Sequence, residues 1–173
     1  MELFLEKLSL ALAQQLPLPE KIACYGVAFS GGLDSSVLLT GLARLDHMPV
    51  RALHVNHGLH PDSNQWEDHC RSVAVSLGVD FESLRVSIKP RPGKSLEAQA
   101  RAIRYQALES MLWPNELLLT AHHAEDQLET ILLRLLRGSG VKGLRGIASL
   151  RRSGVHYVAR PMLDVTRNEI HSQ

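Results

Sequence analysis

The feature that most constrains the fold is a strand-like apolar run that stops abruptly at two glycines. Residues Ile22 to Phe29 are mostly apolar, and Ser30-Gly31-Gly32 follows at once. Such a run is typical of a buried strand that enters a tight loop. From Ser35 to Leu45 apolar residues recur at helical spacing and cover a face wide enough to pack on a sheet. Residues 22–45 therefore predict a strand, a glycine loop and a helix in succession.

The same alternation of strand and helix continues along the chain. Further strands are expected at Val50 to Asn56, Asp80 to Ile88, Glu116 to Ala121 and His156 to Leu163, and further helices at Ser63 to Leu77, Ser95 to Met111 and Ala124 to Arg137. Parallel neighbours need a crossover connection, which helices supply. The fold class is thus predicted to be α/β: a doubly wound, mostly parallel, Rossmann-like sheet with helices on both faces.

Cap signals mark several helix ends. Ser63 or Asn64 is expected to cap the helix that Gly78 ends. Thr166 and Glu169 have the spacing of a capping box, so another helix begins there. The chain stops at Gln173, too soon for a stable helix. Residues 1–173 are therefore interpreted as one domain that is truncated at its C-terminal end.

Composition narrows the class of protein. With 173 residues, 45% hydrophobic and 21% charged, the chain matches one ordinary globular domain. A formal net charge of +1 means that any nucleic-acid contact must be local. Cys24 and Cys70 form no CxxC pair, which argues against a disulfide framework and a cysteine metal site. Residues 1–16 read as an amphipathic helix rather than a signal peptide, and no segment approaches the ~20 apolar residues of a membrane span. The sequence predicts a soluble, cytoplasmic protein.

The strongest chemical signal lies in the glycine loop and the first helical turn, made of Ser30, Gly31, Gly32, Leu33, Asp34 and Ser35. Glycines let the backbone approach a phosphate, and the first amides of a helix point at it with the positive end of the helix dipole. Asp34 either caps the helix or holds a magnesium ion that bridges to the phosphates, and the metal-assisted interpretation is favoured. The P-loop motif GxxxxGK[ST] is absent from the sequence, which disfavours ordinary γ-phosphoryl transfer, and the glycine loop after the first predicted strand is not a GxGxxG dinucleotide fingerprint.

The loop sequence SGGLDS resembles the SGGxDS motif of the PP-loop ATP pyrophosphatases, which cleave ATP to AMP and pyrophosphate while adenylating a substrate. A second segment, HVNHGL from His54 to Leu59, narrows the resemblance to the tRNA(Ile)-lysidine synthetases. A histidine at a strand end is by itself more often packed or solvent-facing than catalytic. The resemblance implies an adenine nucleotide alpha hydrolase-like fold, in which the backbone of His54 and Val55 lines the adenine pocket.

Two further segments carry candidate functional side chains. Arg101 and Arg104 are three residues apart on one predicted helical face, and a solvated face is the simpler interpretation. Asp126 and Glu129 also share a helical face, near His122 at a predicted strand end, and acids in a first turn commonly complement the helix dipole. These segments resemble the EAxARxxRY and HxxxDQxET motifs of the same family. The resemblance implies catalytic roles for Arg101, Asp126 and Glu129 beside Asp34, and substrate or phosphate contacts for Arg104 and His122.

A basic, glycine-rich run from Arg134 to Gly146 completes the set of motifs. Cations at a helix end and glycines in a loop are usually structural, but a local basic strip suits tRNA phosphates. The run resembles the family's RLLRGSGxxGLxGI segment, and RPML at 160–163 resembles its RPLL strand. Arg137 and Lys142 are therefore expected to contact phosphates.

The resemblance implies a complete reaction and its partners. ATP and Mg²⁺ would adenylate the wobble cytidine of tRNA(Ile) with a CAU anticodon, and L-lysine would displace AMP at C2 to give lysidine. The family's C-terminal tRNA-binding domains are not present in residues 1–173. Two alternatives stay open: another PP-loop enzyme, such as a tRNA thiolase or an amidotransferase synthetase, and an inactive fragment that binds nucleotide or RNA. No membrane partner is expected, and the sequence leaves the oligomeric state open, with a homodimer among the options.

Overall fold

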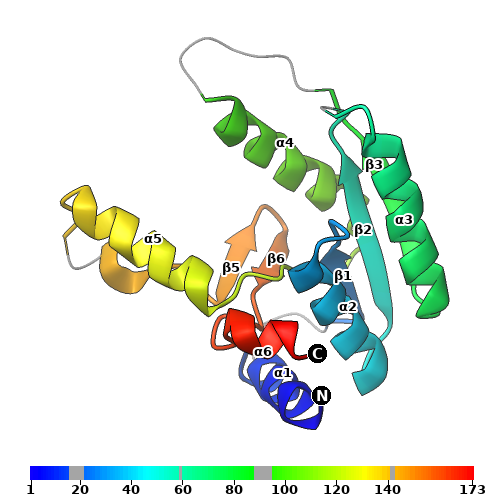
Figure 1. Ribbon diagram of the computed structural model, residues 1–173, viewed down its shortest axis with the longest axis horizontal. Helices are drawn as coiled ribbons and strands as arrows, with labels where there is room; N and C mark the ends of the chain where they lie inside the picture. The colour runs from blue at the N-terminus through cyan, green and yellow to red at the C-terminus, as the bar shows by residue number, and fades with distance from the viewer. Residues whose placement is uncertain (16–21, 59, 88–94, 141–142) are drawn as a thin grey trace.

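A computed structural model describes residues 1–15, 22–58, 60–87, 95–140 and 143–173 (Figure 1). Along the chain it contains α1 (Glu2–Gln15), β1 (Cys24–Ala28), α2 (Leu33–Leu45), β2 (Val50–Asn56), α3 (Ser63–Ser76), β3 (Asp80–Arg85), α4 (Leu96–Met111), β4 (Glu116–Leu119), α5 (Ala124–Leu136), the 3-10 helix η1 (Gly143–Arg145), β5 (Leu150–Ser153), β6 (His156–Ala159) and α6 (Arg167–His171). The predicted alternation of strands and helices is confirmed.

The strands form one six-stranded sheet in the order β3-β2-β1-β4-β6-β5. All neighbouring pairs are parallel except β5 and β6, which pair antiparallel. The order in which strands are added to the sheet reverses at β1: β2 and β3 lie on one side of it, and β4, β6 and β5 lie on the other. In such sheets the crevice at the reversal, beyond the carboxyl ends of the strands, is the usual ligand site.

Helices cover both faces of the sheet, as the sequence predicts. The larger core packs α1, α2, α3 and α6 on one face, with Phe4, Leu38, Cys70 and Ile170 among its buried members. The smaller core packs α4 on the other face through Leu108, Met111 and Leu112. The remaining long helix, α5, extends away from the sheet (Figure 1).

Several predicted boundaries need correction. Helix α3 has Asp62 as its N-cap rather than Ser63 or Asn64, and the N-cap makes no side-chain hydrogen bond. The Asn64 side chain instead accepts a hydrogen bond from Asn56 at 3.3 Å. Strand β6 ends at Ala159 rather than Leu163, because Pro161, which has no N–H for a ladder, follows in a turn. Strand β4 ends at Leu119, two residues before the predicted end. The predicted end of β3 at Ile88 lies outside the described residues.

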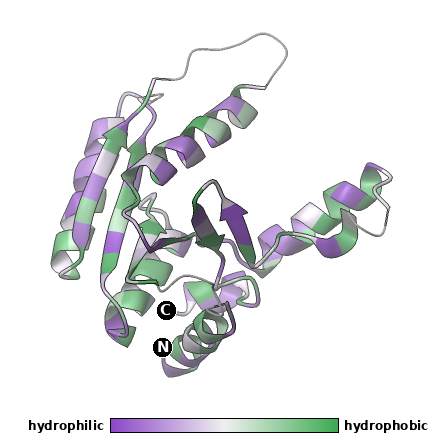
Figure 2. Ribbon diagram, turned by 180° about the vertical axis from the view of Figure 1, so that it is seen from behind, coloured by the Kyte–Doolittle hydropathy of each residue, from purple (hydrophilic) through white to green (hydrophobic). Residues whose placement is uncertain are grey.

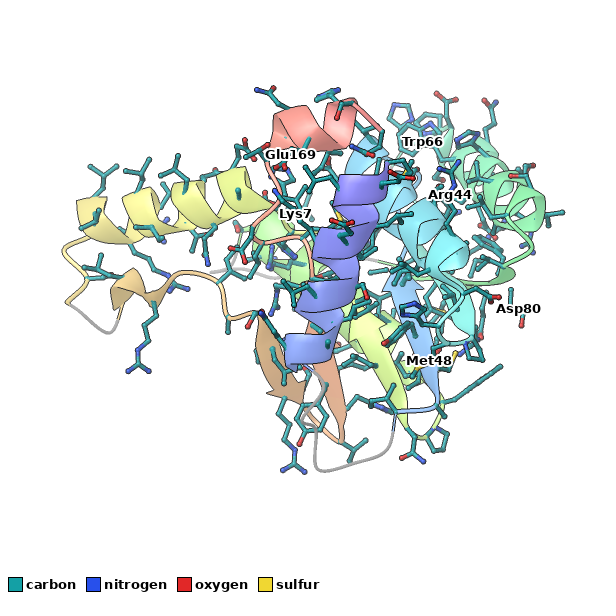
Figure 3. The ribbon with its side chains drawn as sticks, turned by 90° about the horizontal axis from the view of Figure 1, so that it is seen from below. Lys7, Arg44, Met48, Trp66, Asp80 and Glu169 are labelled. Atoms are coloured by element: carbon teal, nitrogen blue, oxygen red, sulfur yellow. The ribbon has the colours of Figure 1, made fainter. Side chains whose placement is uncertain are left out.

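The predicted helix start at Thr166 is confirmed, and a short helix does form. The Thr166 N–H donates to Glu169 at 2.8 Å and the Glu169 N–H donates to the Thr166 hydroxyl at 3.3 Å. Tertiary contacts stabilise α6, which is too short to be stable alone: Ile170 is fully buried, and Glu169 pairs with Lys7 of α1 (Figure 3). Within the described part of the chain, no helix has the length and apolar character needed to cross a membrane.

Candidate functional site

A cavity of about 580 Å³ opens beyond the carboxyl ends of β1, β2 and β4. Its walls come from the loops that follow these three strands, and α4 closes one side. The volume falls within the range of roughly 300–1,000 Å³ that is usual for ligand and cofactor pockets. The lining residues from the predicted site are Ser30, Gly32, Asp34, Ser35, His54, Val55, Arg104, His122 and Asp126.

The loop between β1 and α2 is held in shape by its own serines. The Ser30 N–H donates to the Ser35 hydroxyl at 3.3 Å, and that hydroxyl donates to the Gly32 carbonyl at 3.0 Å. Gly32 is the N-cap of α2 and has no side chain, so no side chain caps the first amides of the helix. Capping therefore does not explain Asp34, which lies one residue inside α2. The loop and the helix start present backbone donors to the cavity, as a phosphate site requires.

The shape of this loop depends on Gly31. Its φ of +80° lies in the left-handed region that favours glycine, and a Cβ at this position would lie 2.7 Å from the Cys70 sulfur of α3. The loop is thus packed directly on α3, and neither Gly31 nor Leu33 belongs to the cavity wall.

A buried histidine lies close to two carboxylates that line the cavity. The Nε2 atom of His123 lies 3.7 Å from Oδ2 of Asp34 and 3.7 Å from Oδ2 of Asp126. The His123 N–H donates to the Asp126 carboxylate at 2.9 Å, so Asp126 does serve the start of α5 as the dipole interpretation expects. Sequence reasoning missed His123, because only the neighbouring His122 matched a motif. The three side chains join the start of α2 to the start of α5.

The neighbouring His122 is held uncharged. Its Nδ1 atom lies 2.9 Å from the Thr120 hydroxyl, within hydrogen-bond distance. Burial, with a further contribution from the positive charge of Arg160, lowers the pKa of His122 to about 4. At neutral pH this side chain offers the cavity a neutral imidazole.

The end of β2 supplies polar atoms on one side and apolar surface on the other. The Nδ1 atom of His54 donates to the Phe29 carbonyl at 2.9 Å. This ring therefore links β2 to the start of the loop from Ser30 to Ser35, which is called the phosphate loop below. Val55 packs instead with Tyr105 and Leu108 of α4, which also line the cavity. Among the described side chains, the Nδ1 atom of His57 is buried in the cavity wall without a hydrogen-bond partner. A bound ligand can satisfy it.

A second cluster of polar side chains, which the sequence did not reveal, joins the end of β2 to α3 and β3. The Asn56 side chain donates to Glu67 of α3 at 2.8 Å and accepts from the Gly58 N–H at 2.9 Å. Glu67 also accepts hydrogen bonds from Ser83 at 2.7 Å and Arg85 at 3.2 Å. Burial alone would raise the pKa of Glu67, but the hydrogen bonds from Asn56, Ser83 and Arg85 outweigh it and hold the pKa at about 2.

Other predicted residues lie away from the cavity wall. The Arg101 guanidinium lies 5.6 Å from the Tyr105 ring centroid. Glu129 is exposed one turn farther along α5 than Asp126, and Arg137 is exposed at the end of that helix. Lys142 lies outside the described residues. The structure therefore groups nine of the predicted residues at the cavity and places Arg101, Glu129 and Arg137 outside its wall.

The two carboxylates that line the cavity fit a magnesium ion that also takes ligands from substrate phosphates and water. Within the described ranges, no group of three or more side chains is arranged to hold a metal ion. Mg²⁺ is commonly bound by one or two carboxylates together with substrate phosphates and water. Asp34 and Asp126, both near His123 and next to the phosphate loop, match that requirement.

Comparison with known proteins agrees with this geometry. The sequence pattern of the PP-loop domain matches residues 5–173. The chain belongs to the PP-loop family. Membership implies that this domain binds ATP.

This PP-loop chain is similar to curated proteins named tRNA(Ile)-lysidine synthase. It is 47% identical to a tRNA(Ile)-lysidine synthase from Alkalilimnicola ehrlichii, over 93% of this chain and 37% of that protein. It is 49% identical to one from Pseudomonas syringae pv. tomato, over 84% of this chain and 33% of that protein. The chain thus spans about a third of the length of these relatives.

Solved structures share the PP-loop fold at low sequence identity. A U34-tRNA thiolase from Methanococcus maripaludis superposes with a TM-score of 0.70 at 17% identity, over 99% of this chain and 63% of that one. An NH3-dependent NAD synthetase from Campylobacter jejuni superposes with a TM-score of 0.60 at 15% identity, over 96% of this chain and 68% of that one. These similarities establish the α/β fold.

Proposed function

We propose that this PP-loop domain is the catalytic part of an enzyme that joins L-lysine to C2 of the wobble cytidine of tRNA(Ile) with a CAU anticodon. The observation that carries the proposal is the cavity whose wall contains the phosphate loop together with Asp34 and Asp126, two carboxylates that His123 links. The identity of 45–49% to tRNA(Ile)-lysidine synthases supports the choice of substrate.

In the first step the cytidine O2 attacks the α-phosphorus of ATP, and the bond from that phosphorus to the β-phosphate bridging oxygen breaks. Pyrophosphate leaves, and the cytidine carries AMP on O2. The loop from Ser30 to Ser35 and the first amides of α2 hold the departing pyrophosphate, because fixed donors stabilise charge that develops there. The apolar wall of Val55, Tyr105 and Leu108 takes the adenine.

In the second step the lysine ε-amine attacks C2, and the bond from C2 to the AMP-bearing oxygen breaks. AMP leaves with that oxygen, and the new bond joins C2 to nitrogen. The amine must arrive without its extra proton, which a nearby carboxylate can accept. We assign this role to Asp126, with Glu129 holding the lysine ammonium as it enters. We place Arg101, Arg104 and Arg137 along the tRNA backbone, and Lys142 with them.

Magnesium belongs to the proposal as a partner of Asp34 and of the phosphates of ATP, so that the Asp126 carboxylate can accept the amine proton. When bound there it would neutralise negative charge on the phosphates of ATP. His123 fixes the separation of the two carboxylates, and the uncharged His122 adds no positive charge to the site. Both cysteines are unpaired and buried, which agrees with a reducing, cytoplasmic setting.

The cysteines also bear on the alternative of a tRNA thiolase. Cys24 begins β1, at the opposite end of that strand from the cavity, and Cys70 is buried under Gly31. These two thiols do not face each other across the site. The geometry therefore favours lysidine formation over sulfur transfer.

The test uses ATP, labelled lysine and a tRNA(Ile) transcript with the CAU anticodon at low salt and high tRNA concentration. We expect the chain to bind ATP and to transfer lysine, and Asp34→Asn to lower ATP–pyrophosphate exchange by about 100-fold or more, the scale of losing one electrostatic contact to a transition state. Asp46→Asn at the other end of α2 is the matched control and should leave exchange unchanged. Binding of ATP with no lysine transfer at any tRNA concentration would overturn the proposal.

A further inference from the structure

The rim of the cavity carries an exposed aromatic pair that the proposed reaction does not use. The rings of His60 and Trp66 are stacked, with centroids 4.7 Å apart and an interplanar angle of 21°. Both side chains line the cavity, yet 51% of Trp66 is exposed. Figure 3 marks Trp66 in the first turn of α3. A large ring that is half-exposed beside a binding site is placed where a ligand can cover it.

Hydrogen bonds in the turn that starts α3 hold the backbone of both residues, and one of them also reaches the His60 ring. The Ser63 N–H donates to the His60 carbonyl at 3.0 Å, and the Trp66 N–H donates to the Asp62 carbonyl at 3.0 Å. The Asp62 N–H donates to Nδ1 of His60 at 3.2 Å, which orients the imidazole. The pair is therefore preorganised by the turn that starts α3. Preorganised rings lose little conformational freedom when a partner stacks on them.

The position of the pair separates it from the adenine wall. Val55, Tyr105 and Leu108 belong to the core on the α4 face of the sheet. Trp66 belongs to α3, whose residues Cys70 and Ala74 are buried in the core on the opposite face. The phosphate loop lines the same cavity. One side thus offers an enclosed apolar wall, and the other offers an exposed stacking surface.

We propose that His60 and Trp66 form a stacking platform for an unpaired base of the tRNA anticodon loop. The inference rests on the proposed function, since it takes tRNA as the substrate. Proteins recognise single-stranded RNA loops largely by stacking splayed bases on aromatic side chains. The substrate base must come from solvent to meet the phosphates of ATP, and the platform lies on the exposed rim that such a base would pass.

The chain offers a direct optical readout of this stacking. It contains two tryptophans, Trp66 and Trp113, and the Arg51 guanidinium lies 3.6 Å from the ring centroid of Trp113. Trp113→Phe keeps a ring against Arg51 and leaves Trp66 as the sole tryptophan. In that background we expect an anticodon stem-loop RNA with a CAU loop to quench Trp66 emission in a saturable way. ATP alone should leave the emission unchanged.

Binding of the same RNA, followed by fluorescence anisotropy, tests the energetic contribution. Trp66→Ala should weaken binding of the stem-loop by roughly tenfold, which is the scale of one lost base–aromatic stack. Trp66→Phe should restore most of that affinity, because it keeps an aromatic face. Gln65→Ala, at an exposed neighbour on α3, is the control for a local change in the helix. ATP affinity should be the same in all three variants.

Two outcomes would overturn the inference. Quenching by ATP alone, with weaker ATP binding in Trp66→Ala, would assign the platform to adenine instead. Unchanged RNA affinity and emission would show that no base stacks there. Failure of the proposed function has a different signature: if the stem-loop quenches Trp66 but lysine is never transferred, the platform stands and the lysidine reaction falls.

Discussion

The phosphate loop and helix α5 both carry strong sequence motifs, yet the fold treats them in opposite ways. Helix α2, which follows the loop, buries Ser35, Val37, Leu38, Leu39, Gly41 and Leu42. Helix α5 buries none of its described side chains and extends from the body of the molecule with apolar residues along its length (Figure 2). Helix α5 contacts η1 and the residues that follow it, where Gln127 and Arg134 donate to the backbone carbonyls of Ile147 and Gly146.

The difference teaches that the strength of a motif does not predict how firmly its residues are held. The loop is built into the larger core, so its geometry is set by the folding of the whole domain. The first turn of α5 is anchored to the body of the molecule, where His123 contacts Asp34 and the Ala124 N–H donates to the Val165 carbonyl. Glu129 and Arg137 lie farther out on a helix that is exposed on most sides. The site thus combines a half that is built into the core with a half that is held mainly at its first turn.

The sharpest test of the rigid half is a cavity-forming change beneath the loop. Leu38 of α2 is fully buried in the larger core. Leu38→Ala should lower the free energy of unfolding by about 3–5 kcal/mol, because it removes packing that the surroundings cannot refill. Urea denaturation measures this directly. A loss below about 1 kcal/mol would mean that the loop half is no more tightly packed than α5.

A smaller effect is expected from the polar cluster around Glu67, which joins the end of β2 to α3 and β3. The pKa of Glu67 is about 2 in the folded protein, below its ordinary value of 4.5. The unfolded chain therefore takes up this proton first on acidification, and stability that is present above pH 4.5 is lost as the pH falls toward 2. The full change corresponds to about 3 kcal/mol.

Glu67→Gln should remove this part of the acid sensitivity, as measured by urea denaturation between pH 5 and pH 2. Asp68→Asn, at the exposed next residue of α3, is the control and should keep the wild-type profile. If the Gln variant loses stability on acidification as steeply as wild type, Glu67 is not the group responsible.

The anchored turn of α5 should show an intermediate effect. Asp126→Asn removes the charge that accepts the His123 N–H and complements the helix dipole, and should cost roughly 0.3–1 kcal/mol. Glu129→Gln, on the exposed surface, should cost less. Both variants should lose lysine transfer if the proposed roles are right. Normal transfer by either variant at reduced stability would return that residue to a purely structural role.

The smallest effect is expected on the exposed face of α5. Leu128, Leu132, Leu135 and Leu136 follow one another at helical spacing, and Leu136 is 85% exposed. Leu132→Ala should change the free energy of unfolding by less than about 0.5 kcal/mol, since surface substitutions rarely do more. Calorimetry at two protein concentrations checks this. A loss comparable to that of Leu38→Ala would show that α5 is covered in solution and would break the comparison.

The sequence predicted the parts of this molecule whose local pattern and tertiary role agree. Alternating apolar runs predicted the order of strands and helices, and the glycine loop predicted where the cavity opens. Buried polar groups were not predictable, because local pattern treats a charge as solvated. Glu67 reads as an ordinary helix acid, and Arg51 within a strand reads as an exposed charge. In the structure Arg51 donates to Glu116 at 2.7 Å with both side chains buried.

Two other gaps have similar causes. Strand β5 contains Arg151 and Arg152, so it lacks the alternation of a strand and forms only because it pairs with β6. His123 stands next to a motif residue without belonging to the motif, and its role depends on Asp34 of a distant segment. Spacing along one element cannot reveal a contact that two elements create.

The packing of Gly31 on Cys70 has a consequence for how this domain can change over generations. Any side chain at position 31 would overlap the sulfur at position 70, and a larger residue at position 70 would press on the loop. The two positions are therefore coupled through this contact. A side chain at position 31 of the phosphate loop would first require more space in α3, so this helix limits how the loop can vary.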